Sequence, residues 1–491
     1  MQFTCNFRKK SAEEEKKTEV RIHIEGDGEE RNFPRVKEVI EKFGEHCRSV
    51  ADYHDIVVNL IWRFTEIHID KAIAFIMLHI CVQEVGAMNI PYIIYVAVTL
   101  TKPKYTRKMS FCAAVWTSCV VILKMIYQME FIKEDMLTVY CEDLYGINDT
   151  VHAPDWVGLH KTDGVFTYTR NYILLTILLA FRSIVELRQS LHRYERGEMT
   201  PVKGVLFNNI TRQDLDRDLC SCFKYFVNFF FYRFGLEVCL MTTVITIGLR
   251  SDMLSVVYAI MLLIVLSLER KKLASIWSYI AISFAFLFTW QYILCVGIPK
   301  AFCQADFFLL LFICQQLGVF YIEANEQDYI GGTNESIVDG PSTRHGRKAL
   351  FKIDSDDKAE EVNEPALPDF VGKMDSLLDR LKRIIFVHLY WVTLSVVFVA
   401  GTSRVTLFAF GYVVGCFMFL WVGNSLFLKP MRITLALWNK LIIYNASVIF
   451  VKISLQVVGC VYMSQMYKNF CWVIQLLGIA CLKTGIKPEN S

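Results

Sequence analysis

Residue types that could perform catalysis do not occur here at the spacings that a catalytic site needs. The sequence has no HExxH, GxSxG or GxGxxG pattern and no phosphate-binding P-loop. Two short pairs, Cys220 with Cys222 and His46 with Cys47, lack further cysteines or histidines at metal-ligand spacing. We therefore expect that the protein is not an enzyme and holds no cofactor and no metal ion.

Charged residues inside apolar segments are the remaining candidates for chemistry. Lys124, Glu237 and Lys452 lie in three such segments, and His79 and Glu84 lie in a fourth. Charges are costly in lipid and often functional, and several of them facing one cavity would indicate a proton or ion relay. These residues are scattered along the chain, which favours ion pairing between helices or side chains that extend to the interface. A self-contained transporter with twelve spans is the alternative.

Apolar blocks of membrane-spanning length dominate the sequence. Of its 491 residues, 54% are hydrophobic, and the net charge of +3 gives no electrostatic support for a nucleic-acid partner. We predict an all-α polytopic membrane protein, with membrane lipids as its immediate partners. The twelve predicted spans are residues 68–86, 88–101, 110–129, 171–187, 234–249, 253–268, 274–296, 305–322, 384–401, 405–427, 433–460 and 471–482.

Basic loops predict the orientation of these spans. Lysine and arginine cluster at residues 102–108, 270–272 and 429–432, and such clusters favour the cytoplasmic side. All three loops fall on one side together with the N-terminus, so an even number of spans places both termini in the cytoplasm. Residues 1–34 are charged, lack an apolar leader and are predicted to be disordered.

A repeat of four spans is visible in the tryptophans. Trp116, Trp277 and Trp438 each follow one of the basic loops, at intervals of 161 residues. Tryptophan is common at membrane interfaces, so we expect these three residues to act as interfacial anchors. Three ordinary interfacial tryptophans without a repeat are the alternative.

An amphipathic helix is predicted before each group of four spans. Apolar residues recur at helical spacing within residues 36–50, 215–230 and 370–385, with charged residues on the other faces. Such helices commonly lie flat in the headgroup region, and packing against the protein's own loops is the alternative. The predicted organisation is a charged segment, three units of one amphipathic helix and four spans, and a linker before the third unit: 1–34, 35–190, 191–322, 323–368 and 369–491.

Two long loops separate the spans. Residues 130–170 are predicted to be extracellular and contain Asn148 in a glycosylation sequon. Residues 323–368 are polar and acidic, and they are predicted to form a cytoplasmic linker.

Several long runs resemble the Piezo-type mechanosensitive ion channels. They include LDRDLCSCFKYFVNFFFYRFGLEVCL (215–240), VWTSCVVILKMIYQM (115–129), PDWVGLHK (154–161), VFVAGTSRVTLFAFGYVVGCF (397–417) and NFCWVIQLLGIACL (469–482). The resemblance covers roughly residues 35–485. It corresponds to a stretch in the middle of the family's peripheral blade, although the link at residues 297–308 is shorter than in the family.

The resemblance implies a blade segment of a mechanosensitive, non-selective cation channel of the plasma membrane. Family members are trimers, and their blades are rows of four-helix units that follow membrane curvature. The pore lies outside the region of resemblance, so the implied segment has no pore of its own, and its partner is the remainder of a homotrimeric channel. A non-conducting membrane scaffold is a further alternative.

Overall fold

The computed structural model describes residues 34–129, 138–140, 150–162, 164–197, 204–208, 210–250, 252–296, 304–325, 329–332, 334, 377–403, 406–427, 431–469 and 471–478. The chain forms two compact units, Met1–Ile61 and Trp62–Ser491. In the first unit the structure describes the start of helix α2, which runs over Pro34–Gln83 and continues into the second unit. The other elements below belong to the second unit.

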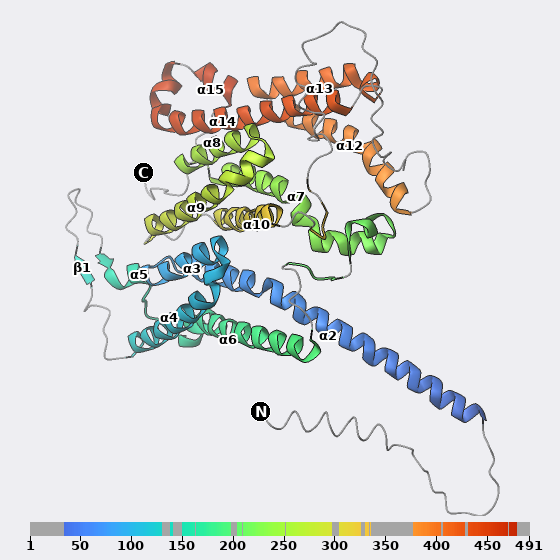
Figure 1. Cartoon of the computed structure of the whole chain (residues 1–491). Helices are drawn as coiled ribbons and strands as arrows, with labels where there is room; N and C mark the ends of the chain where they lie inside the picture. Colours follow the sequence, from blue (N-terminus) through green and yellow to red (C-terminus); the bar gives the residue numbers. More distant parts are fainter. Residues whose placement is uncertain are drawn as a thin grey trace, which may run out of the picture. The chain divides into compact units, whose positions relative to one another are not determined.

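Every predicted span overlaps a helix (Figure 1). After α2 come η1 (Ala87–Asn89), α3 (Ile90–Thr101), η2 (Pro103–Tyr105), α4 (Thr106–Tyr127), α5 (Ala153–Val157), α6 (Val165–Arg196), η4 (Arg212–Asp216), α7 (Leu219–Arg250), α8 (Met253–Ser267), α9 (Arg270–Cys295), α10 (Ala305–Asn325), α12 (Leu377–Thr402), α13 (Leu407–Phe427), α14 (Met431–Asn469) and α15 (Cys471–Leu477). The fold is that of an all-α polytopic membrane protein, as predicted.

Local signals set several helix ends. The carboxylate of Asp252 accepts a hydrogen bond from the Ser255 amide at 3.0 Å and so caps the start of α8. Helix α6 ends at Gly197, whose φ of 65° is the left-handed conformation that glycine adopts most readily. Pro91 occupies the first turn of α3, where its missing N–H costs nothing.

Among the residues that the structure describes, six helical segments are long and apolar enough to cross a membrane. They are Pro103–Tyr127, Leu219–Arg250, Arg270–Cys295, Ala305–Asn325, Leu377–Thr402 and Ala436–Val457. Three shorter apolar helices lie at Ala87–Thr101, Met253–Ser267 and Leu407–Trp421. Helices α2 and α6 carry more charge, and the total of twelve spans stays a prediction.

The predicted amphipathic helices are not separate elements. The stripes at residues 36–50, 215–230 and 370–385 were expected to precede the spans. Helix α2 contains the whole first stripe, α7 contains residues 219–230 of the second and α12 contains residues 377–385 of the third, and each helix continues into the span without a break. No proline lies at these junctions to end the helix, so the backbone ladder continues. At the other end of the chain, α15 covers seven residues of the predicted span 471–482.

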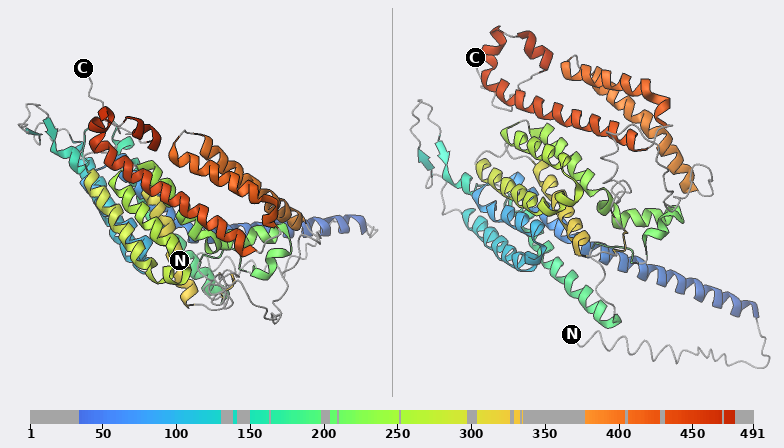
Figure 2. Two further views of the ribbon diagram at one scale, coloured as in Figure 1. Left: turned by 90° about the horizontal axis from the view of Figure 1, so that it is seen from above. Right: turned by 45° about the horizontal axis from the view of Figure 1, so that its top comes forward.

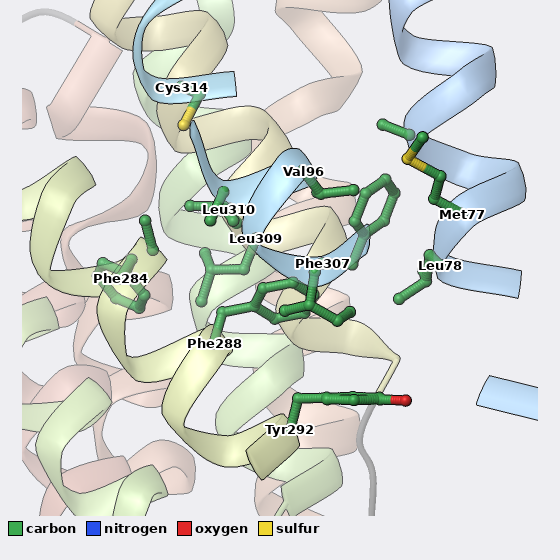
Figure 3. Packing of buried hydrophobic residues seen from close by; sticks show 14 of the residues in the cluster. Met77, Leu78, Val96, Phe284, Phe288, Tyr292, Phe307, Leu309, Leu310 and Cys314 are labelled. Carbon is green, nitrogen blue, oxygen red and sulfur yellow. The ribbon is translucent and has the colours of Figure 1, made fainter. Parts of the chain in front are cut away.

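One hydrophobic core joins helices from different predicted units. Helix α3 packs against α9 and α10, and α8 packs against α14. Figure 2 shows the blue α3 beside the yellow-green α9 and the yellow α10, and Figure 3 shows Val96 of α3 in one cluster with Phe288 of α9 and Phe307 of α10. Ile453 of α14 belongs to the same cluster. Helices of the three predicted units therefore bury apolar surface against one another.

A small two-stranded sheet lies in the loop predicted to be extracellular. Strand β1 (Thr138–Tyr140) pairs antiparallel with β2 (Thr150–His152), with Val139 opposite Val151.

Candidate functional site: a buried lysine cluster

Lys124 lies on the inward face of α4. The buried residues of this helix recur every three or four positions, and Lys124 continues the stripe: Thr106, Ser110, Ala113, Thr117, Val120, Lys124 and Tyr127. Two hydroxyl contacts hold this face against α3. The Tyr92 hydroxyl donates to Thr117 Oγ1 at 3.1 Å, and the Tyr95 and Ser110 hydroxyls are 3.1 Å apart. The α-helical period thus carries a lysine into the bundle.

Glu84 is the charged partner of this lysine. Lys124 Nζ lies 2.6 Å from Glu84 Oε2 and donates to the Gly158 carbonyl at 3.0 Å. The same ammonium lies 3.8 Å from the ring centroid of Tyr168 and 4.9 Å from that of Tyr172. A carboxylate, a carbonyl and two aromatic faces therefore replace the water that the ammonium loses.

Hydrogen bonds hold Glu84 in place in turn. The Tyr172 hydroxyl lies 2.9 Å from Glu84 Oε2 and 3.0 Å from Asn89 Oδ1, and it can donate to either oxygen. Asn89 Nδ2 donates to the Glu84 carbonyl at 2.6 Å. We call Lys124, Glu84, Asn89, Tyr168 and Tyr172 the Lys124 cluster.

Two glycines allow the backbones around the cluster to approach closely. A Cβ added at Gly86 would lie 2.9 Å from Gly158 Cα and 2.9 Å from the Val157 carbonyl oxygen. Gly158 itself has a φ of 98°, in the left-handed region that glycine favours. The Tyr292 hydroxyl of α9 donates to the Gly86 carbonyl at 3.2 Å. A side chain of the second predicted unit therefore reaches the segment that carries Glu84.

The other two predicted intramembrane charges lie elsewhere. Glu237 is exposed on α7 and has no ion pair among the described residues. Lys452 is half-buried on α14, with its Nζ 5.8 Å from the centroid of the Phe408 ring. His79 lies on α2 and takes no part in the Lys124 cluster. The structure therefore brings together Lys124 and Glu84 of the predicted set and leaves the others apart.

Ion pairs that the sequence did not predict join further helices. Arg182 Nε of α6 lies 2.5 Å from Asp70 Oδ1 of α2, and Arg193 Nη1 lies 2.9 Å from Glu66 Oε1. Arg250, at the end of α7, pairs with Asp306 of α10. The sequence shows these residues as acidic and basic side chains in separate helices. Which of them pair depends on the tertiary structure.

The three predicted anchor tryptophans occupy different surroundings. Trp116 is 39% exposed, and its Nε1 donates to the Met88 carbonyl at 3.1 Å. Trp277 is 2% exposed and donates to the Ile313 carbonyl at 2.9 Å. Trp277 therefore lies inside the helix bundle, where its indole packs between α9 and α10. Its role as an interfacial anchor stays a prediction.

Trp438 is half-buried and packs against two other rings. Its ring centroid lies 6.0 Å from that of Tyr390 and 5.0 Å from that of Phe419. The regular spacing of the three tryptophans in the sequence thus does not give them one common environment.

Asn148, the glycosylation candidate, lies outside the described residues. Within the described ranges, no group of three His, Cys, Asp or Glu residues is arranged to hold a metal ion. Cys220 is exposed and Cys222 is buried at the start of α7.

Sequence comparison places the chain among known proteins. Residues 355–490 match the family described as Piezo TM25-28. The chain is 32% identical over 477 residues to the Piezo-type mechanosensitive ion channel component of Drosophila melanogaster, and the alignment covers 88% of this chain and 18% of that protein. It is 30% identical over 503 residues to Piezo-type mechanosensitive ion channel component 1 of Homo sapiens, covering 91% of this chain and 19% of that protein.

A mouse protein shows the same relation. Piezo-type mechanosensitive ion channel component 1 of Mus musculus is 30% identical over 476 residues, which cover 86% of this chain and 18% of the mouse protein. The chain thus spans less than a fifth of the length of these relatives. By its sequence, the chain belongs to the Piezo family of mechanosensitive ion channel components.

Proposed function

We propose that this chain is a blade segment of a mechanosensitive, non-selective cation channel, and that it senses membrane tension and curvature without a pore of its own. In this proposal the segment works with the remainder of a homotrimeric channel in the plasma membrane, and both termini are cytoplasmic. The relatives are named as mechanosensitive ion channel components, and the chain matches a short part of each.

The shared core between predicted units is the observation that carries the proposal. Helix α3 of the first unit packs on α9 and α10 of the second, and α8 of the second packs on α14 of the third. The Tyr292 hydroxyl donates to the Gly86 carbonyl across the first of these joints. Close-packed interiors transmit displacement, so a tilt of one unit is passed to the next.

Such coupling suits a tension sensor for a simple reason. Membrane tension does work on a protein in proportion to the change in the area that the protein occupies in the membrane plane. Small tilts that add along a row of linked units give a large change in area. A second point supports the row of units: the matched residues 355–490, described as TM25-28, overlap the predicted third unit at 369–491.

The placement of the intramembrane charges supports a structural role for them. Lys124 is paired with Glu84, whereas Glu237 and Lys452 lie on α7 and α14 with different neighbours. A relay would need several of these groups along one path. The arrangement therefore favours the blade segment over the transporter alternative.

Distances between spin labels test the proposal. We would place labels at Lys104, in the first predicted unit, and at Ser403, in the third, both of them exposed. The chain would be reconstituted into small, strongly curved vesicles and into large, nearly flat ones. We expect the distance distribution measured by pulsed electron paramagnetic resonance to differ between the small and the large vesicles.

A label pair within one unit gives the control. Lys104 and the exposed Leu187 both lie in the first predicted unit, and their distance should be the same in both kinds of vesicle. An unchanged distance between Lys104 and Ser403 would reject the curvature-sensing proposal. Solute uptake into vesicles that is abolished by Glu237→Gln or Lys452→Met would instead favour the transporter.

A further inference from the structure

A pocket of about 410 Å³ adjoins the Lys124 cluster. It lies where the end of α2 meets the start of α6 and the segment that precedes α6. Its lining includes Glu84, His160, Thr162, Tyr168, Asn171 and Tyr172. Ion pairing within the bundle does not require such a space, so the pocket needs a separate explanation.

The accessible charge in this pocket is negative. The side chain of Glu84 is 20% exposed, whereas that of its partner Lys124 is 0% exposed. A ligand entering the pocket therefore meets the carboxylate, while the balancing ammonium lies behind it. This asymmetry favours a cationic ligand and disfavours an anion.

Hydrogen-bonding capacity in the lining is unused. Glu84 Oε2 is occupied by Lys124 and Tyr172, but Glu84 Oε1 accepts no hydrogen bond from a described residue. Thr162 Oγ1 is buried and has no partner in the described part of the chain. A buried hydroxyl without a partner is costly, and a ligand with an N–H or O–H donor can satisfy it.

The aromatic walls already accommodate an ammonium group. Tyr168 and Tyr172 line the pocket, and their rings lie 3.8 Å and 4.9 Å from Lys124 Nζ. Carboxylate and tyrosine together are the surroundings that organic ammonium groups prefer in proteins. A calcium or magnesium ion fits less well, because Glu84 is the one carboxylate among the described residues of the lining and these ions need several oxygen ligands.

We propose that this pocket binds a small organic ammonium group, with its positive nitrogen at Glu84 Oε1 and its substituents against Tyr168, Tyr172 and Thr162. The ammonium has two sources, the head group of a choline or ethanolamine lipid and a free amine in solution. Binding at this place contacts α2, α6 and the segment between α5 and α6, and so joins three parts of the bundle.

Binding of radiolabelled choline and ethanolamine to the full chain tests this proposal. The chain would be placed in nanodiscs of phosphatidylglycerol, whose head group carries no ammonium. We expect saturable binding by the unaltered chain. The double variant Lys124→Met/Glu84→Gln removes the carboxylate charge without leaving a lone buried charge, and it should weaken binding about tenfold or more.

A second variant and a matched control keep the test decisive. Thr167→Leu fills the pocket from an exposed lining position, leaves the ion pair intact and should also abolish binding. Lys452→Met removes a half-buried lysine outside the pocket and should leave binding unchanged. Circular dichroism and thermal unfolding identify the variants that fold.

Nanodiscs of phosphatidylcholine then separate the two sources. Loss of free choline binding in these discs indicates that the lipid head group occupies the pocket, and retained binding indicates a soluble amine. Either result supports an ammonium site. The proposal is overturned if neither amine binds saturably in phosphatidylglycerol, or if folded Thr167→Leu binds as well as the unaltered chain.

Discussion

Lys124 Nζ and Glu84 Oε2 lie 2.6 Å apart and join α4 to the segment that follows α2. The lysine side chain is 0% exposed and that of the glutamate is 20% exposed. A charge in such surroundings is costly without its partner, because the interior cannot replace its water. The two residues are therefore best understood as one neutral unit within the bundle.

Removing one member of this pair should destabilise the protein more than removing both. Glu84→Gln leaves a wholly buried lysine, so we expect a loss of about 3–5 kcal/mol in the free energy of unfolding. Lys124→Met leaves the more exposed glutamate and should cost less. The double variant should be more stable than Glu84→Gln, as measured by SDS titration in mixed micelles. A double variant no more stable than Glu84→Gln would contradict the pairing.

Gly86 should not tolerate a side chain. Its Cβ would approach Gly158 Cα and the Val157 carbonyl oxygen to 2.9 Å, and both are backbone atoms that cannot rotate away. We expect Gly86→Ala to lower the thermal unfolding temperature. The matched control is Gly248→Ala in α7, where the new Cβ meets nothing within 4 Å. Alanine there should be neutral or stabilising by up to about 1 kcal/mol, because it favours the helix.

Tyr292 should contribute to the joint between the first two predicted units. Tyr292→Phe removes the hydroxyl that donates to the Gly86 carbonyl at 3.2 Å, at a cost of about 1 kcal/mol. We also expect a broader distance distribution between labels in the two units. Tyr279→Phe removes a hydroxyl from a side chain that is 73% exposed, and it is the control. Equal effects of the two substitutions would show that the hydroxyl of Tyr292 does not stabilise the joint.

Hydropathy alone located the helices but not the contacts between them. Each predicted span overlaps a helix, because about 20 apolar residues in a row can satisfy their backbone in lipid only as a helix. Helix ends were less well predicted, because they depend on caps such as Asp252. The strands at 138–140 and 150–152 are too short for a sequence pattern to reveal.

The candidate site was predictable in part. Lys124 and Glu84 were recognised as charges in apolar segments, but nothing in the sequence shows that residues 40 positions apart form a pair. The contact between Tyr292 and Gly86 spans 206 positions and has no local signature. The surroundings of Trp277 were also not predictable. Its residue type and spacing predict an anchor at the membrane interface, but they do not reveal that tertiary packing leaves its side chain 2% exposed.

Acid should weaken the capping box that starts η4. The Thr211 backbone N–H and hydroxyl both donate to Asp214, at 3.0 and 2.8 Å, and they lower the pKa of this exposed carboxyl below its ordinary value of 3.8. A carboxyl with a lowered pKa stabilises the folded form above its ordinary pKa, and this contribution is lost as the pH falls through the lower folded value. We therefore expect faster hydrogen exchange at the Thr211 amide, relative to its intrinsic rate, only below about pH 4. Asp214→Asn should remove this pH dependence, and a persisting dependence would assign it to another group.

Quenching by brominated lipid should distinguish two of the repeated tryptophans. Bromine on the acyl chain quenches indoles that contact lipid. The fluorescence that is lost when one tryptophan is replaced by phenylalanine therefore reports whether that tryptophan contacts lipid. Trp116 is 39% exposed on α4, whereas Trp277 is 2% exposed and bonded to the Ile313 carbonyl. In brominated lipid, Trp116→Phe should remove a part of the fluorescence that bromine quenches. Trp277→Phe should remove a part that bromine leaves unquenched. Because both side chains donate an indole N–H to a carbonyl, at 3.1 and 2.9 Å, hydrogen bonding cannot explain such a difference, which leaves exposure to lipid as its cause. Equal quenching of both components would place Trp277 at the lipid surface and contradict the packing of α9 against α10.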